Sequence, residues 1–172
     1  MEIRPLRPSD DRSAFDSGDE GLDRFFHQYA GQNQFRHYLG VTYVAVDQGK
    51  VLGCATVAPG QIEVDDLPAA TRKKMPRYPL PILRLARLAV DRSARSSGLG
   101  KQLLRFACQL AGAMADDFGC AGVVVDAKPD AVAFYAKYGF VSFEALEGQS
   151  DARPRATPMF LAMHAIKSAP DK

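Results

Sequence analysis

Two spacings of hydrophobic residues alternate along the chain, and they predict both helices and strands. Apolar residues recur three or four positions apart between 22 and 29, which indicates an amphipathic helix over about 18–34 that opens with a capping box at Ser17. Residues 41–46 and 51–57 are rich in β-branched side chains and flank a short polar turn, so they predict a β-hairpin. This mixture indicates an α/β or α+β fold.

The rest of the chain continues the alternation after a proline-rich stretch. Residues 59–81 contain five prolines and predict a long ordered surface loop with a short helix near 69–75. The elements expected after it are, in order, a strand at 81–91, a helix at 100–118, a strand at 121–125, a helix at 131–138 capped by Asp130, and strands at 140–145 and 159–166.

Length and composition are those of an ordinary soluble globular protein. The 172 residues are 47% hydrophobic and 24% charged, which excludes a disordered or fibrous chain. We expect a single domain over 1–167, followed by a flexible tail over 168–172. Arg84 and Arg87 interrupt the apolar run from 81 to 90. The first five residues are not followed by the apolar stretch that a signal peptide contains. The sequence therefore predicts no membrane span, no secretory signal and a cytoplasmic location.

The three cysteines, Cys54, Cys108 and Cys120, lie in apolar surroundings and show no CxxC spacing. Such cysteines are typical of buried reduced thiols rather than of a disulfide framework or a zinc site. We therefore expect no metal.

Positive charge is concentrated in the middle of the chain. The formal net charge is only +2, but the window from 72 to 95 holds eight basic residues against one acidic residue, Asp91, and has a net charge of +7. Such a window is typical of a site for an anionic ligand or partner. Its basic residues are Arg72, Lys73, Lys74, Arg77, Arg84, Arg87, Arg92 and Arg95.

A glycine-containing turn joins the strand expected at 81–91 to the helix expected at 100–118. It reads Arg95-Ser96-Ser97-Gly98-Leu99-Gly100, with Lys101 next. The backbone N–H groups of such a turn converge on the helix N-terminus and attract phosphate, and a glycine lets a diphosphate approach the backbone. A turn chosen only for tightness and, more weakly, a dinucleotide site are the alternatives that these residues leave open.

Three motifs stand in order along the second half of the chain: Leu85-Ala86-Arg87-Leu88-Ala89-Val90-Asp91, Arg95-x-x-Gly98-x-Gly100 and Phe134-Tyr135-x-x-Tyr138-Gly139-Phe140. Together they resemble the acetyl-CoA motifs of the GNAT N-acetyltransferases, over roughly residues 82–143. The resemblance implies a GNAT fold, a mixed and mostly antiparallel sheet of about six to seven strands flanked by helices. It also implies a splay between the two central strands, into which the pantetheine arm inserts.

The same resemblance implies which residues meet acetyl-CoA. Backbone groups of Leu88, Ala89 and Val90 would hold the pantetheine arm, and an N–H there would polarise the thioester carbonyl. Tyr135 matches a tyrosine near the departing sulfur, where a phenol with a pKa of about 10 acts as a hydrogen-bonding or general acid at neutral pH. The remaining cofactor-binding residues would be Arg95, Ser96, Ser97, Gly98, Leu99, Gly100, Lys101 and Phe134.

Further motifs extend the comparison to about residues 4–145: Phe15-Asp16-Ser17-Gly18 before Leu22-x-x-Phe25-Phe26, then Thr42-Tyr43-Val44, then Pro76-Arg77-Tyr78-Pro79-x-Pro81. They resemble the GNAT toxins of toxin–antitoxin pairs, which acetylate the α-amino group of aminoacyl-tRNA and so block translation. This resemblance implies aminoacyl-tRNA as the acceptor, a ribbon-helix-helix antitoxin as partner, and a homodimer.

Two properties of the sequence agree with that acceptor. An α-amino group has a pKa of about 7.7 to 8.0 and is partly neutral at cell pH, whereas a lysine would call for a dedicated base. The sequence offers no strong base, because Glu63 and His37 are typical of solvated side chains. The basic window suits a polyanion. Its candidate tRNA-binding residues are Lys73, Lys74, Arg77, Arg84 and Arg87.

The residues leave other interpretations open. The acceptor is instead a polyamine, an antibiotic or a protein N-terminus if Arg84, Arg87 and Arg95 serve only the phosphates of coenzyme A. A different class is a regulatory module that binds acetyl-CoA or an antitoxin without turnover.

Overall fold

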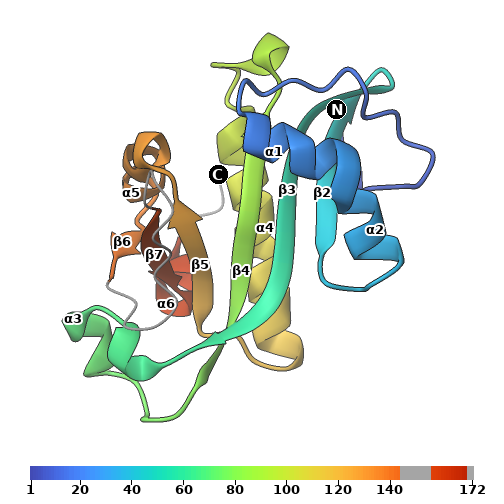
Figure 1. Cartoon of the computed structure of the whole chain (residues 1–172). Helices are drawn as coiled ribbons and strands as arrows, with labels where there is room; N and C mark the ends of the chain where they lie inside the picture. The colour runs from blue at the N-terminus through green and yellow to red at the C-terminus, as the bar shows by residue number, and fades with distance from the viewer. Residues whose placement is uncertain (144–155, 170–172) are drawn as a thin grey trace. The chain divides into compact units, whose positions relative to one another are not determined.

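Seven strands form one sheet in the computed structural model, which describes residues 1–143 and 156–169. Their spatial order is β1, β2, β3, β4, β5, β7, β6 (Figure 1). The expected mixed, mostly antiparallel sheet is confirmed. The strands are β1 (Glu2–Pro5), β2 (Val41–Asp47), β3 (Lys50–Ile62), β4 (Leu80–Val90), β5 (Gly122–Ala127), β6 (Val141–Ser142) and β7 (Thr157–Ala162).

Helices connect these strands. The α-helices of the described residues are α1 (Glu20–Arg24), α2 (Ala30–Phe35), α3 (Ala69–Arg72), α4 (Leu99–Asp117), α5 (Val132–Lys137) and α6 (Met163–Ser168). A π-helical turn, Phe25–Tyr29, joins α1 to α2, and short 3₁₀ turns cover Val64–Asp66, Arg92–Ala94 and Pro129–Ala131. No helix in this part of the chain combines the length and the apolar character that crossing a bilayer requires.

The described residues divide into two compact units, each made of two segments of the chain. The first unit comprises Met1–Ala58 and Leu85–Ala107, and the second comprises Pro59–Arg84 and Cys108–Lys172. The single domain over 1–167 and the splay between the central strands stay predictions.

The hairpin of β2 and β3 lies at the centre of the first unit and buries both of its faces. Its register pairs Val44 with Cys54, and their side chains point to one face because directly opposite residues of paired strands lie on the same side of the sheet. The segment from α1 to α2 crosses that face, where Phe26 packs into the same cluster (Figure 1). The first half of α4 lies against the other face, where the rings of Tyr43 and Phe106 are 4.8 Å apart. The expected hairpin is confirmed.

The hairpin turn has the conformation that the strand twist requires. Gln48 and Gly49 have φ angles of 50° and 77°, so both turn residues are left-handed. A two-residue loop of this kind matches the right-handed twist of the flanking strands.

The second unit is built around the antiparallel pair of β5 and β7. Val124 lies opposite Phe160 in the register, and both side chains are buried with Ile82 and Phe143. Gly122 begins β5 at a very close approach, since a Cβ there would lie 2.3 Å from the carbonyl oxygen of Leu161 and 2.7 Å from the Phe160 ring. Only glycine fits this position.

Two of the helix caps expected from the sequence are wrong. Asp19 caps α1, accepting from the N–H of Leu22 at 3.0 Å, while the Ser17 hydroxyl donates to Asp23 at 2.7 Å. Asp130 does not cap α5 because it lies inside the preceding 3₁₀ turn, and the residue at the cap, Ala131, makes no side-chain hydrogen bond.

The expected strand over 159–166 is correct only in its first half. β7 ends at Ala162, and the chain turns into α6 at Met163, whose N–H donates to the carbonyl of Ala121 at 2.8 Å. Of the strand expected at 140–145, only Val141–Ser142 is a strand among the described residues, and 144–145 lie outside them. Residues 170–172 of the expected tail also lie outside them, whereas Ser168 ends α6.

The close approach at Gly122 generates a stability prediction. We expect Gly122→Ala to lower the free energy of unfolding by about 3 kcal/mol or more, because the new methyl group meets a backbone oxygen that no rotamer change moves away. Gly112→Ala is the control: a Cβ there comes no nearer than 3.8 Å to the Lys167 ammonium, and alanine favours the helix by roughly 0.5 to 1 kcal/mol. Urea unfolding measures both, and equal stabilities would contradict the close approach.

Candidate functional site

The turn between β4 and α4 presents backbone N–H groups at a helix N-terminus. Ser96 and Gly98 have φ angles of 61° and 84°. The N–H of Ser97 donates to the Ala94 carbonyl at 3.3 Å, and the N–H of Gln102, in the first turn of α4, donates to the Gly98 carbonyl at 3.1 Å. A helix that starts at Leu99 leaves its first N–H groups without intrahelical partners, and these carry partial positive charge. A Cβ at Gly98 would meet no protein atom within 4 Å. The space beside Gly98, where a side chain would stand, is therefore open.

A glycine in β3 fixes the position of this helix start. A Cβ at Gly53 would lie 2.9 Å from Leu103 and 3.0 Å from Leu99, both buried on α4, and 3.3 Å from the carbonyl oxygen of Ala89. The helix start, the end of β4 and β3 therefore pack in direct contact through a residue without a side chain.

The buried carboxylate of Asp91, just after β4, organises the start of the turn. One oxygen accepts from the N–H of Asp16 at 2.9 Å, and the other accepts from the N–H and the hydroxyl of Ser93 at 3.0 and 2.6 Å. Lys50 adds a charge 4.0 Å away. Burial raises the pKa of Asp91, but these hydrogen bonds outweigh burial and hold it below its ordinary value. The carboxylate is therefore charged at neutral pH.

The loop over 15–18 lies directly against the turn. The Arg95 guanidinium donates to the carbonyl oxygen of Ser17 at 2.7 Å, and Arg92 forms an ion pair of 3.2 Å with Asp16. Gly18, with a φ of 88°, would bring a Cβ within 2.6 Å of the Arg95 guanidinium. The motif at 15–18 is therefore a support for the turn. The sequence alone does not predict this role, although the Asp-x-Ser order of 91–93 is a signal for a capped turn.

The end of β4 carries the residues expected to hold the pantetheine arm. Ala89 is buried, whereas Leu88 and Val90 are half-buried. The guanidinium carbon of the neighbouring Arg87 lies over the Phe25 ring, 3.6 Å from its centre. Burial lowers the pKa of Arg87, and no side chain in the described ranges pairs with its guanidinium.

Tyr135 is buried on α5 among aromatic rings. Its ring centre lies 5.2 Å from that of Phe134 and 5.4 Å from that of Phe140. Burial raises its pKa to about 12. Its hydroxyl has no hydrogen-bond partner in the ranges described, and no fully enclosed side-chain oxygen or nitrogen there lacks one. The hydroxyl is therefore not sealed inside the core.

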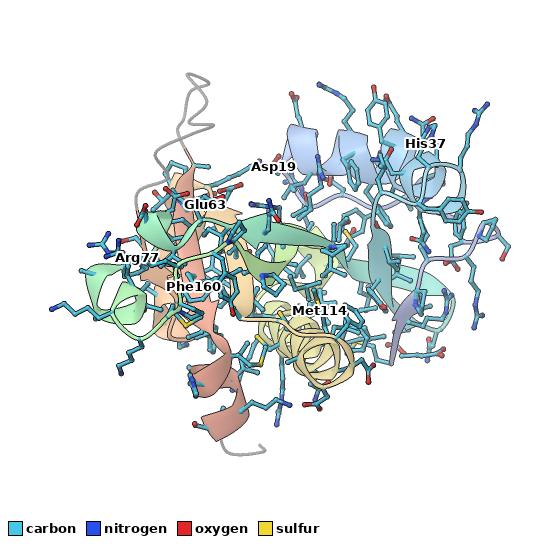
Figure 2. The ribbon with its side chains drawn as sticks, turned by 90° about the horizontal axis from the view of Figure 1, so that it is seen from below. Asp19, His37, Glu63, Arg77, Met114 and Phe160 are labelled. Atoms are coloured by element: carbon cyan, nitrogen blue, oxygen red, sulfur yellow. The ribbon has the colours of Figure 1, made fainter. Side chains whose placement is uncertain are left out.

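The structure places the basic residues of the window in different settings. Lys73, Lys74 and Arg77 are exposed around the end of α3, and Figure 2 shows Arg77 at the surface of the second unit. Arg84, by contrast, forms an ion pair of 3.1 Å with Asp126. Arg84 is thus partly neutralised, and the exposed trio is free of carboxylates among the described residues.

The other candidates for chemistry are weak. Glu63 and His37 are both exposed, each in its own unit (Figure 2). Burial raises the pKa of Cys54 to about 12 and that of Cys108 to about 11, so these thiols stay protonated at neutral pH. All three cysteines are free thiols. None of these groups is set up as a nucleophile or base.

Residues 39–142 match the family of acetyltransferase (GNAT) domains, a segment that includes β2 to β6, the turn and Tyr135. The chain belongs to the GNAT acetyltransferase family. The expected fold and the expected enzyme class, an acetyltransferase, are confirmed.

Similar GNAT proteins include one curated relative and two solved structures. The chain is 36% identical over 140 residues to the tRNA-acetylating toxin of Mycobacterium tuberculosis (strain ATCC 25618 / H37Rv). The aligned segment covers 80% of this chain and 82% of the toxin. AtaT complexed with acetyl-methionyl-tRNAfMet is 25% identical, with a TM-score of 0.83 and 96% of each chain covered. AtaTR bound with AcCoA is 25% identical, with a TM-score of 0.78 and coverage of 96% and 95%.

The contacts of Asp91 generate a prediction about the GNAT turn. We expect Asp91→Asn to lower the free energy of unfolding by about 2 kcal/mol at pH 7, since the amide cannot accept from both Asp16 and Ser93. The folded pKa of Asp91 lies below 3.8. The carboxylate therefore stabilises the fold above about pH 4, and the difference from the variant shrinks as the pH falls through the folded pKa.

Urea unfolding at several pH values measures this difference. Asp126→Asn is the matched control, because it removes an exposed ion pair with Arg84 worth about 0 to 1 kcal/mol. An Asp91→Asn variant as stable as the control at pH 7 would show that the buried carboxylate does not hold the turn.

Proposed function

We propose that the chain is an acetyl-CoA-dependent N-acetyltransferase toxin that acetylates the α-amino group of aminoacyl-tRNA and thereby blocks translation. The observation that carries this proposal is the 36% identity to a tRNA-acetylating toxin over four-fifths of the chain. The similarity to AtaT complexed with acetyl-methionyl-tRNAfMet supports the same acceptor class. AtaTR bound with AcCoA supports acetyl-CoA as the donor.

The turn after β4 fits the diphosphate of acetyl-CoA. The first N–H groups of α4 are available to an anion, the space over Gly98 is open, and Lys101 is exposed beside them. Leu88, Ala89 and Val90 would hold the pantetheine arm, and Phe134 would line it. The diphosphate would bind Arg95, Ser96, Ser97, Gly98, Leu99, Gly100 and Lys101.

Acetyl transfer needs one fixed donor for the carbonyl oxygen and one for the sulfur. A neutral α-amine attacks the thioester carbon, the C–N bond forms, and the C–S bond breaks. A backbone N–H at 88–90 stabilises the negative charge that develops on the carbonyl oxygen. Tyr135, whose pKa of about 12 keeps it protonated, donates a hydrogen bond to the departing thiolate. The proton that the amine loses is matched by a proton that the thiolate gains, and the leaving group departs as the coenzyme A thiol.

The acceptor explains why this site needs no strong base. An α-amino group with a pKa of about 7.7 to 8.0 is partly neutral at cell pH. Glu63 and His37 are both exposed, which agrees with an amine that loses its proton to solvent before it attacks.

The toxin interpretation brings two partners and a location. A ribbon-helix-helix antitoxin would neutralise the enzyme, a second copy would complete a homodimer, and the aminoacyl-tRNA pool places the reaction in the cytoplasm. Co-expression with the product of the adjacent gene, followed by size determination of the purified complex, tests both partners.

Transfer of labelled acetyl groups tests the activity directly. The protein is incubated with labelled acetyl-CoA and total charged tRNA, and the products are separated by size. Label on charged tRNA that is removed by deacylation supports the proposal. Label on small amines or on a protein N-terminus would identify a different acceptor, and no transfer at all would leave a binding module.

Removing the Tyr135 hydroxyl separates its chemistry from its packing. We expect Tyr135→Phe to lower turnover by roughly 100-fold or more, the scale of general acid groups, with little change in acetyl-CoA affinity. Stability should hardly change, because the hydroxyl has no protein partner in the ranges described. Single-turnover rates and calorimetry check these outcomes.

Tyr138→Phe is the matched control, since Tyr138 is half-buried on the same segment with its ring 5.2 Å from Phe134. We expect it to turn over normally. Equal rates for the two variants across pH 6 to 9 would reduce Tyr135 to a packing residue.

The exposed basic trio provides a test of tRNA binding. We expect neutralising Lys73, Lys74 and Arg77 together to weaken tRNA binding whatever the tRNA sequence. The salt slope should fall by roughly 0.7 to 0.9 for each phosphate that the variant no longer neutralises. The Michaelis constant for acetyl-CoA is the internal control and should stay unchanged. Full affinity with the same slope at several salt concentrations would make the trio an ordinary solvated surface and favour a small acceptor.

A further inference from the structure

Exposed apolar side chains are concentrated in the segment of the chain that contains α2, outside the site described above. The described residues include eight large hydrophobic residues that are exposed, and four of them fall between 29 and 39. We call these four the aromatic patch: Tyr29 at 43% exposure, Phe35 at 38%, Tyr38 at 84% and Leu39 at 63%. Three of the four are aromatic, so the patch offers flat rings and not only apolar surface.

Tyr38 has a backbone conformation that is unfavourable for a residue with a side chain. Its φ is 55°, in the left-handed region, where the chain closes α2 by a bond of 3.0 Å from the Leu39 N–H to the carbonyl of Asn33. Glycine or asparagine is usual at such a position, and a bulky residue there is strained. Because the side chain is 84% exposed, burial does not offset that strain. The tyrosine therefore costs stability without contributing to the core.

The stretch of sequence that carries the patch is basic. From residue 24 to residue 46 the chain contains no aspartate or glutamate, while Arg24 and Arg36 are charged. Arg36 and His37 stand between Phe35 and Tyr38, and both are exposed. Figure 2 shows His37 at the surface of the first unit, at the end of the helical segment. Exposed rings that neighbour arginines in the chain are complementary to the bases and phosphates of nucleic acid.

We propose that the aromatic patch stacks unpaired bases of the single-stranded 3′ end of the acceptor RNA. This inference rests on the proposed function, because it gives the aminoacyl-tRNA a second contact besides the basic trio. Rings bind the π-face of any base without hydrogen-bond readout. The patch would therefore hold the 3′ end in a way that tolerates different sequences, while phosphates meet the lysines and arginines.

Replacement of Tyr38 by glycine tests the proposal, because strain and binding predict opposite effects. We expect Tyr38→Gly to keep or raise the midpoint of urea unfolding, since glycine relieves the left-handed strain. We expect the same variant to bind charged tRNA, and a fluorescent single-stranded RNA ending in CCA, roughly five-fold or more weakly, the effect expected for one stacked base. The salt slope should not change, because stacking releases no counterions.

Two matched variants accompany it. Tyr38→Phe keeps the ring and should bind like the wild type, whereas Phe118→Ala removes an exposed aromatic residue of the second unit and should not alter RNA affinity. The Michaelis constant for acetyl-CoA should be the same in all of these proteins.

The outcomes separate this inference from the proposed function. If the wild-type protein acetylates charged tRNA and Tyr38→Gly binds RNA as tightly as the wild type, the aromatic patch is not an RNA contact although the proposed function stands. A variant that keeps its RNA affinity but no longer self-associates also overturns the inference and makes the patch a contact between copies. A wild-type protein that transfers no acetyl group to charged tRNA defeats the proposed function itself.

Discussion

The buried carboxylate of Asp91 is the constraint on which the candidate site of the first unit depends. It accepts hydrogen bonds from Asp16, 75 positions earlier in the chain, and from Ser93 in the turn that follows. The carboxylate is both buried and charged. A buried charge is tolerated only where hydrogen bonds satisfy it, so the loop over 15–18 and the turn before α4 must stay in place together. The N–H groups at the start of α4 are positioned by this requirement.

Close packing complements that electrostatic constraint. Gly53 lets α4 lie directly on β3, and Gly18 lets Arg95 reach the carbonyl of Ser17. In both places the missing side chain allows a contact that fixes the turn without adding any chemical group to it. The candidate site on the first unit thus consists of backbone groups held by glycines and one carboxylate.

The two arginines of β4, Arg84 and Arg87, show that the positive charge of a side chain does not by itself define its role in a site. The sequence assigns Arg84 and Arg87 together to tRNA, yet Arg84 pairs with Asp126 whereas Arg87 stacks on Phe25. An exposed ion pair is weak, while a guanidinium held over a ring gains a cation–π contact and, among the residues that the structure describes, pairs with no carboxylate. The same residue type therefore has two different capacities within one strand.

The sequence by itself determined the types of element and the chemistry of the motifs. Hydrophobic period, β-branched runs and the glycine turn are local signals, and they placed the hairpin, β4, α4 and the turn before α4 nearly where the structure has them. It failed for the caps at Ser17 and Asp130 and for the end of β7, where competing contacts decide the local conformation. Only the tertiary structure decided that Asp91 joins two distant segments and that Tyr135 is enclosed by rings with its pKa raised to about 12. It also decided that Tyr38 is strained and exposed. These properties arise from burial and from contacts between residues far apart in the chain, which a local pattern does not encode.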